Sequence, residues 1–275
     1  MPFTVDLKGK NVLVTGGGRG LGIDIAKSLA TAGANLVLTY NSSPADKLAA
    51  ELEKEFGVKV KAYKMPGDDS QAISSTVEQV TKEFGELDVI VANAGICIHE
   101  DAETMSDKQF EDVFRVNTFG PYYLARAAYR SWFPNGRSGA QPKDKVILFV
   151  SSISGSISNT PQNQCSYNAS KAALTHLGKS LAGEWVDQGV RVNTLSPGYI
   201  CKWNWTQLSP KRFSFSYADG SESGKKNAEK WKELTPMHRF AQPKEIADWV
   251  TWMASPFASY QTGGEIIVDG GYTIF

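Results

Sequence analysis

The 275-residue chain is long enough for one or two domains, and its 41% hydrophobic and 21% charged residues are typical of soluble globular proteins. Its 29 basic residues balance 29 acidic residues, which argues against nucleic acid or an anionic membrane as a partner. Cysteines and histidines are few and scattered, and no apolar run reaches ~20 residues. We therefore expect a cytoplasmic protein without a disulfide framework, a membrane span or a metal site.

Short β-branched segments alternate with longer amphipathic segments along the chain. Seven strands are expected, at Asn11–Val14, Asn35–Thr39, Lys59–Tyr63, Val89–Val91, Lys145–Val150, Val190–Leu195 and Glu265–Val268. Apolar runs with little alternation are typical of parallel strands buried on both faces, and the intervening helices supply the crossover connections. The pattern predicts a single doubly wound, Rossmann-like α/β domain with a mostly or wholly parallel seven-stranded sheet.

Two segments depart from this alternation of strands and helices. Pro134–Lys143 is rich in turn-forming residues and is predicted to be a surface loop. The segment 203–233 mixes aromatic residues with Ser, Gly and Lys, so we expect a partly helical, substrate-covering flap whose aromatics pack down or face a ligand. These aromatics are Trp203, Trp205, Phe213, Phe215, Tyr217 and Trp231.

A glycine-rich loop, Thr15–Gly22, follows the first expected strand and opens a helical pattern. Glycine lets the backbone turn sharply and approach a pyrophosphate, and the unpaired N–H groups at a helix N-terminus favour an anion. This context predicts a dinucleotide cradle rather than a plain turn, and the missing Gly-Lys-Ser/Thr ending argues against a nucleoside triphosphate loop. The cradle residues are Gly16, Gly18, Arg19, Gly20 and Leu21.

Further motifs follow the loop, whose spacing is T-G-x-x-x-G-x-G. They are Asn93-Ala94-Gly95, Asn117, Ser152, the Y-x-x-x-K pair Tyr167 and Lys171, Pro197-Gly198 and Thr262-Gly263-Gly264. In this combination the chain resembles the short-chain dehydrogenase/reductase family, from about Leu7 to Tyr272. The resemblance implies an oxidoreductase that moves a hydride between a nicotinamide cofactor and a carbonyl or alcohol carbon.

Tyr167 and Lys171 stand four residues apart, which places them on one face of a helix. A free phenol has a pKa near ~10, and a neighbouring ammonium favours the phenolate. We therefore expect Lys171 to lower the pKa of Tyr167 so that the tyrosine exchanges protons at neutral pH. The family resemblance further implies that Lys171 holds the nicotinamide ribose, that Ser152 hydrogen-bonds the substrate oxygen, and that Asn117 steadies a proton-relaying water.

The choice of catalytic serine rests on local context, because several serines cluster after the fifth expected strand. The family's commonest gap of thirteen residues to the tyrosine selects Ser154. Ser152 instead ends the strand and begins an S-x-x-G pattern with Gly155, which is the usual setting in the family. We predict that Ser152 is the catalytic serine.

The end of the second expected strand decides between NAD and NADP. An acidic residue there would accept the ribose hydroxyls of NAD and repel a 2′-phosphate, but the sequence is Tyr40-Asn41-Ser42. Arg19 can offer charge-assisted hydrogen bonds to a phosphate, so NADP(H) is the predicted cofactor. Pro66 stands where the family usually has an aspartate beside the adenine. The resemblance implies further cofactor contacts at Gly67, Asn93, Ala94, Gly95, Tyr167, Lys171, Pro197, Gly198 and Ile200.

The segments 161–171 and 196–200 resemble those of fungal and yeast family members that reduce ketoses and other small ketones, of the mannitol dehydrogenase, sorbose reductase and xylulose reductase type. The resemblance implies NADPH-dependent reduction of a ketone to a secondary alcohol with Tyr167 as general acid. It also implies a homotetramer, with helices around 107–132 and 167–188 at one interface and the C-terminal segment at another.

Two other interpretations stay open at this point. The aromatic residues of the flap suit a tailoring reductase of secondary metabolism that acts on a bulkier apolar ketone or imine. A non-catalytic NADPH-binding regulator is the other, although the intact Ser, Tyr and Lys set argues against it. The expected substrate-pocket residues are Ser154, Gln162, Tyr199, Trp203 and Trp205.

Overall fold

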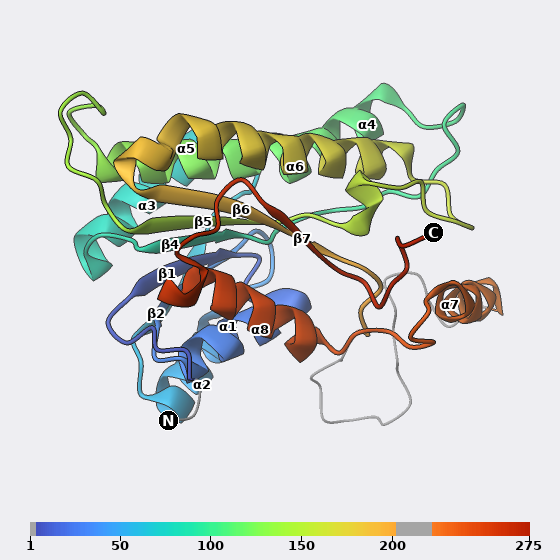
Figure 1. Ribbon diagram of the computed structural model, residues 1–275, viewed down its shortest axis with the longest axis horizontal. Coiled ribbons are helices and arrows are strands. Elements are labelled where there is room, and N and C mark those ends of the chain that lie inside the picture. Colours follow the sequence, from blue (N-terminus) through green and yellow to red (C-terminus); the bar gives the residue numbers. More distant parts are fainter. Residues whose placement is uncertain (1–3, 202–221) are drawn as a thin grey trace.

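The computed structural model describes residues 4–201 and 222–275, and its strands form one sheet in the order β3-β2-β1-β4-β5-β6-β7 (Figure 1). The strands are β1 Asn11–Thr15, β2 Asn35–Tyr40, β3 Val60–Lys64, β4 Val89–Ala92, β5 Lys145–Val150, β6 Val190–Pro197 and β7 Glu265–Val268. Every neighbouring pair is parallel. The predicted doubly wound, wholly parallel architecture is confirmed.

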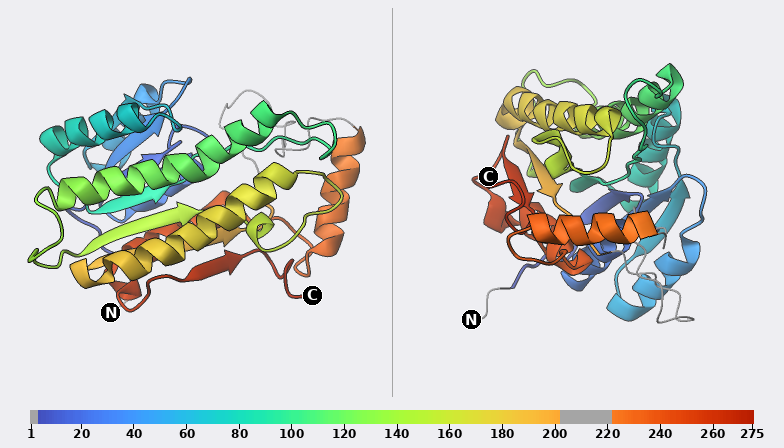
Figure 2. Two further views of the ribbon diagram at one scale, coloured as in Figure 1. Left: turned by 90° about the horizontal axis from the view of Figure 1, so that it is seen from above. Right: turned by 90° about the vertical axis from the view of Figure 1, so that its right-hand side faces the viewer.

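Helices cover both faces of the sheet (Figures 1 and 2). One layer holds α1 Leu21–Thr31, α2 Asp46–Phe56 and α8 Pro243–Ala254, and the other holds α3 Ser70–Phe84, α4 Asp107–Phe114, α5 Gly120–Trp132 and α6 Cys165–Trp185. Within the described part of the chain, none of the helices combines the length and the apolar character needed to cross a bilayer.

Strand β1 illustrates why its sequence is apolar without alternation. Val12 and Val14 pack in the core on the side of α1 and α8, whereas Leu13 packs on the side of α3 and α5. Successive side chains of a strand point to opposite faces, so a strand between two helical layers buries every residue. The expected surface loop at 134–143 joins α5 to β5 and contains no helix or strand.

Helix α7, Glu222–Leu234, lies beyond the carboxyl ends of β5, β6 and β7 (Figure 2). Its Trp231 is buried and stacks on Tyr199 with ring centroids 4.7 Å apart, beside Phe240. This flap aromatic therefore packs down as core. The other expected flap aromatics, Trp203, Trp205, Phe213, Phe215 and Tyr217, lie outside the described residues.

Candidate active site

The predicted motifs meet at the carboxyl edge of the sheet, where the strand order reverses between β1 and β4. Ligands of doubly wound folds bind in the crevice outside this reversal. The glycine loop follows β1, Asn93-Ala94-Gly95 follows β4, and Ser152 follows β5. Pro197 ends β6, and the N–H of Gly198 donates to Val268 of β7 at 2.9 Å.

The glycine loop requires glycine at two positions, by backbone conformation at one and by close packing at the other, and such a bare backbone can approach a dinucleotide. Gly20 has φ 52° and ψ −137°, a conformation that residues with a Cβ rarely adopt. A Cβ on Gly22 would lie 2.1 Å from the carbonyl oxygen of Gly16. The following helix α1 begins at Leu21 without a side-chain cap, and the positive end of a helix dipole favours a phosphate at this place.

Thr15 joins the two halves of this cradle, a role that the sequence did not reveal. Its Oγ1 accepts hydrogen bonds from the backbone N–H groups of Asn93 and Ala94, both at 3.0 Å. The Asn93 amide in turn donates to the carbonyl of Thr15 at 2.9 Å. The loop after β1 and the loop after β4 are thus held as one surface.

The residues expected to select the cofactor lie at the end of β2 and in the loop after β1, and these two strands pair in parallel. Asn41, Ser42 and Arg19 are exposed, and Tyr40 is half-buried. None of residues 40–45 is acidic, and Arg19 makes no ion pair with any described residue. The guanidinium group is therefore available for a phosphate.

Other predicted cofactor residues border the same cleft. A Cβ on Gly95 would lie 3.3 Å from Oδ1 of Asn117 and 3.6 Å from Nζ of Lys171. The carbonyl of Gly67 would lie 1.9 Å from a Cβ on Gly120, so the loop after β3 touches the start of α5. Ile200 forms an isolated bridge with Ala241 at the entrance to α8. Gly18 lies against Ala45, next to the N-terminus of α2.

Tyr167 and Lys171 lie on α6, with Nζ of the lysine 5.6 Å from the centre of the phenol ring. The lysine is buried and donates to the carbonyl of Val150 at 2.9 Å. Burial lowers the pKa of Lys171 to about 8. Burial, aided by the nearby Cys97 group, raises the pKa of Tyr167.

The expectation that the pKa of Tyr167 is lowered is therefore wrong for this structure. The ammonium group bonds to a backbone carbonyl instead of the phenol, and the loss of hydration outweighs any gain from its charge. A hydrogen bond from Ser152 acts in the opposite direction but is the smaller effect. At neutral pH the phenol of Tyr167 is protonated.

Ser152 is the serine that contacts Tyr167, whereas Ser154 lies behind it. The two serine oxygens are 3.1 Å apart, and Ser154 also receives a hydrogen bond from Gln164 at 3.2 Å. A Cβ on Gly155 would lie 2.9 Å from the backbone of α6, which explains why the S-x-x-G pattern needs glycine there. The close approach of this turn to α6 brings Ser152 to the tyrosine.

Paired substitution of the two serines tests this assignment. Ser152→Ala is expected to lower kcat at least about a hundredfold, because a hydrogen bond to the reacting oxygen is lost. Ser154→Ala is expected to lose less than about tenfold, because its hydroxyl does not reach that oxygen. Steady-state kinetics of both variants decides the matter, and the reverse order of losses would move the role to Ser154.

Asn117 is fully buried in a π-helical segment, Arg115–Phe119, between α4 and α5. Its Oδ1 accepts from the N–H of Ile96 at 2.9 Å, and its Nδ2 donates to the carbonyl of Ile96 and to Oγ of Ser170. Single π turns occur frequently at functional sites. The predicted helical position is right, and the segment ties the loop after β4 to α6.

Two of the expected pocket residues form a polar network beside α7. Nε2 of Gln162 donates to the hydroxyl of Tyr199 at 3.0 Å, and Oε1 accepts from Nε1 of Trp231 at 2.9 Å. Asn159 adds a bond to the same hydroxyl at 3.2 Å. The expected pocket residues Trp203 and Trp205 lie outside the described residues.

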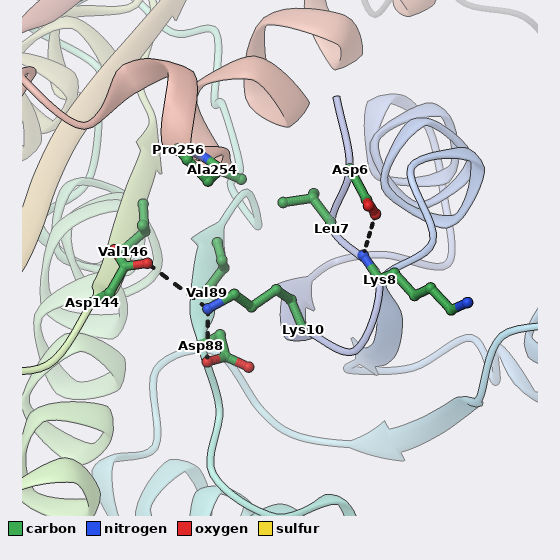
Figure 3. A pocket seen from close by; sticks show the side chains of 10 residues that line it. All are labelled: Asp6, Leu7, Lys8, Lys10, Asp88, Val89, Asp144, Val146, Ala254 and Pro256. Atoms are coloured by element: carbon green, nitrogen blue, oxygen red, sulfur yellow. Dashed lines mark hydrogen bonds and ion pairs between the residues drawn. The ribbon is translucent and has the colours of Figure 1, made fainter. Parts of the chain in front are cut away.

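A cavity of about 110 Å³ lies at the opposite, amino-terminal edge of the sheet (Figure 3). Nζ of Lys10 there faces carboxylates of Asp88 and Asp144 at 3.6 and 3.8 Å. Because these charges pair with one another and lie away from the loops that follow the strands, the catalytic cleft is the one at the carboxyl edge.

Comparisons with known proteins agree with this geometry. The family model described as enoyl-(acyl carrier protein) reductase matches residues 16–273. The sorbose reductase of Schizosaccharomyces pombe is 42% identical over 275 residues, covering 99% of this chain and 99% of the relative. The NADP-dependent mannitol dehydrogenase of Hypocrea jecorina is 39% identical over 271 residues, covering 97% of this chain and 93% of the relative.

Among solved structures, the NADPH-dependent 3-quinuclidinone reductase of Rhodotorula rubra matches with a TM-score of 0.84 at 31% identity, covering 100% of this chain and 97% of that chain. The similarity to all three proteins extends over nearly the whole chain, as the family resemblance implied. The chain belongs to the short-chain dehydrogenase/reductase family of oxidoreductases.

Proposed function

We propose that this enzyme reduces a ketose or another small ketone to a secondary alcohol with NADPH. The observation that carries the proposal is the contact of Ser152 with a protonated, half-buried Tyr167 beside Lys171, at the edge of a glycine cradle. Relatives named sorbose reductase and NADP-dependent mannitol dehydrogenase, each at about two fifths identity over the whole chain, support the ketose class.

The side chains divide the chemistry between them. When bound, NADPH supplies the hydride that reduces the carbonyl carbon. Ser152 donates a hydrogen bond to the carbonyl oxygen, which takes up negative charge as it is reduced. Tyr167, protonated at neutral pH, gives its proton to that oxygen as general acid. Lys171 stabilises the resulting phenolate and holds the nicotinamide ribose, while Asn117 steadies the water through which the proton is replaced.

Arg19 is proposed to select NADPH over NADH. Arg19→Ala is expected to raise KM for NADPH about 10- to 100-fold, because a charge-assisted bond to the 2′-phosphate contributes about 1.5 to 3 kcal/mol. KM for NADH, which lacks this phosphate, should change less than about twofold. Equal use of both cofactors by the wild-type enzyme, or equal losses in the variant, would contradict the assignment.

A substrate panel tests the reaction class. NADPH consumption is followed by absorbance with fructose, sorbose, xylulose, a small diketone and bulky aryl ketones. Turnover of ketoses supports the proposal. Turnover of bulky ketones alone would favour the tailoring reductase. The similarity to the 3-quinuclidinone reductase supports testing this alternative. NADPH binding without turnover of any carbonyl, by folded protein, would favour the non-catalytic regulator.

The homotetramer and the cytoplasmic location are proposed with the function. Phe110, Phe119 and Tyr122 are large, exposed apolar side chains on and between α4 and α5, where the first interface is expected. Ile267 is exposed on the edge strand β7, and Phe275 is exposed at the C-terminal end. Clusters of exposed apolar side chains of this kind mark protein interfaces. Sedimentation of a species with four times the chain mass is the expected result.

A further inference from the structure

Gln164 occupies the N-cap position of α6, but its side chain does not cap the helix. A polar N-cap side chain ordinarily accepts a hydrogen bond from the first turn. Gln164 is instead 4% exposed, and its amide lies among side-chain oxygens. Three oxygens lie within hydrogen-bond distance of Nε2 and share its two protons: Ser154 Oγ at 3.2 Å, Asn159 Oδ1 at 3.1 Å and Asn168 Oδ1 at 2.8 Å.

The neighbouring atoms determine the positions of Nε2 and Oε1 in the Gln164 amide. Three oxygen atoms face Nε2, whereas Oε1 faces the thiol of Cys97 at 3.8 Å. Turning the amide over would place its oxygen against the oxygens of Asn159 and Asn168. Gln164 is therefore a hydrogen-bond donor toward Ser154.

This donor sets the direction of the hydrogen bonds that lead to Ser152. A serine hydroxyl has one proton to donate, and its oxygen can accept two hydrogen bonds. Ser154 is buried, and of the two described side-chain atoms within hydrogen-bond distance of its Oγ, Gln164 Nε2 cannot accept, so the Ser154 proton points to Ser152 Oγ, 3.1 Å away. The backbone N–H of Ser154 also donates to Ser152 Oγ at 3.1 Å. Ser152 then accepts two bonds, and its own proton is left for the reacting oxygen.

We propose that Gln164 is a positioning residue that makes Ser152 a donor to the substrate carbonyl by keeping Ser154 from accepting the Ser152 proton. The proposal rests on the proposed carbonyl reduction, because it assigns the direction of one hydrogen bond in that reaction. Without the Gln164 donor, Ser154 Oγ competes with the substrate oxygen for the proton of Ser152. The substrate then meets a lone pair of Ser152 instead of its proton.

Gln164→Glu tests the direction of the chain with little change in shape. A carboxylate only accepts hydrogen bonds, so it takes the Ser154 proton and turns Ser154 into an acceptor for Ser152. We expect kcat to fall about 10- to 100-fold, with KM for NADPH within about twofold of the wild-type value. Activity should recover as the pH falls through the pKa of the introduced carboxyl, because the protonated acid donates again.

The double variant Gln164→Glu/Ser154→Ala separates positioning from simple structural support. Removing the Ser154 hydroxyl removes the competing acceptor, so the double variant should be faster than Gln164→Glu alone and should approach the rate of Ser154→Ala. A merely structural role predicts losses that add or worsen. Gln164→Leu, which also lacks the donor, serves if the carboxylate destabilises the protein, and it should lose about tenfold without recovery at low pH.

Asn163→Ala is the matched control, since this neighbouring exposed side chain donates to Asp101 at 2.6 Å and not toward Ser152. Its kcat should equal that of the wild type. Wild-type rates for Gln164→Glu, or additive losses in the double variant, would overturn the proposal for Gln164. Absence of wild-type turnover on the whole carbonyl panel would instead count against the proposed function, so the two failures are distinguishable.

Discussion

Tyr167→Phe is expected to lower kcat for carbonyl reduction about a thousandfold while the Kd for NADPH stays within about threefold. Phenylalanine keeps the ring on α6 and removes only the proton donor, and general acid catalysis contributes about 10²- to 10⁴-fold. The remaining Ser152 still polarises the carbonyl, so activity should not fall to zero. Stopped-flow reduction and a fluorescence titration of NADPH measure the two quantities separately.

The pH dependence of kcat tests whether Tyr167 donates the proton during reduction. Burial raises the pKa of Tyr167, so the protonated form required for reduction is fully present throughout the neutral range. Reductive kcat should therefore be flat from about pH 6 to 7.5 and should fall only at alkaline pH. Alcohol oxidation requires the phenolate and should rise over the same alkaline range. A reductive kcat that falls between pH 6 and 7.5 would contradict Tyr167 as the acid.

The fold could be predicted because each strand is recognisable from a short stretch of its own sequence. Val146 to Val150 form an uninterrupted apolar run, and such a run between helical segments fits only a strand buried on both faces. Boundaries were less certain: β6 extends to Pro197, two residues past the expected Leu195, because its end pairs with Val268 of β7. Pairing with a strand that is distant in the sequence cannot be inferred from the local residues.

The candidate site was predictable where spacing along one helix or loop defines it. Tyr167 and Lys171 share a helix face by their interval alone. The protonation of Tyr167 was not predictable, because it depends chiefly on how far the fold removes the phenol from water, and Lys171 donates to Val150 on another element. Gln164 was missed for the same reason, since its oxygen partners come from the turn after β5, the following loop and α6.

Lys171→Met is expected to remove most of the activity and, at neutral pH, to stabilise the fold. The variant lacks the charge that stabilises the Tyr167 phenolate, and the residue that is proposed to hold the nicotinamide ribose. We expect kcat to fall about 10²- to 10³-fold and the Kd for NADPH to rise about tenfold. Both losses should appear in the same kinetic and binding measurements used for Tyr167→Phe. Wild-type turnover by Lys171→Met would remove the lysine from the mechanism.

The stability gain follows from the pKa of Lys171, which burial lowers from 10.5 to about 8. A base whose pKa is lower in the folded state disfavours folding while it is protonated, so the cost is full below about pH 8 and vanishes above about pH 10.5. This displacement corresponds to about 3 kcal/mol, of which the lost bond to Val150 offsets about 1 to 2 kcal/mol. Thermal melts should therefore show a Tm about 2 to 6 °C above wild type at pH 7. The advantage should disappear as the pH approaches 10.5, and an unchanged or lower Tm at pH 7 would show that the ammonium group is not a net cost to the fold.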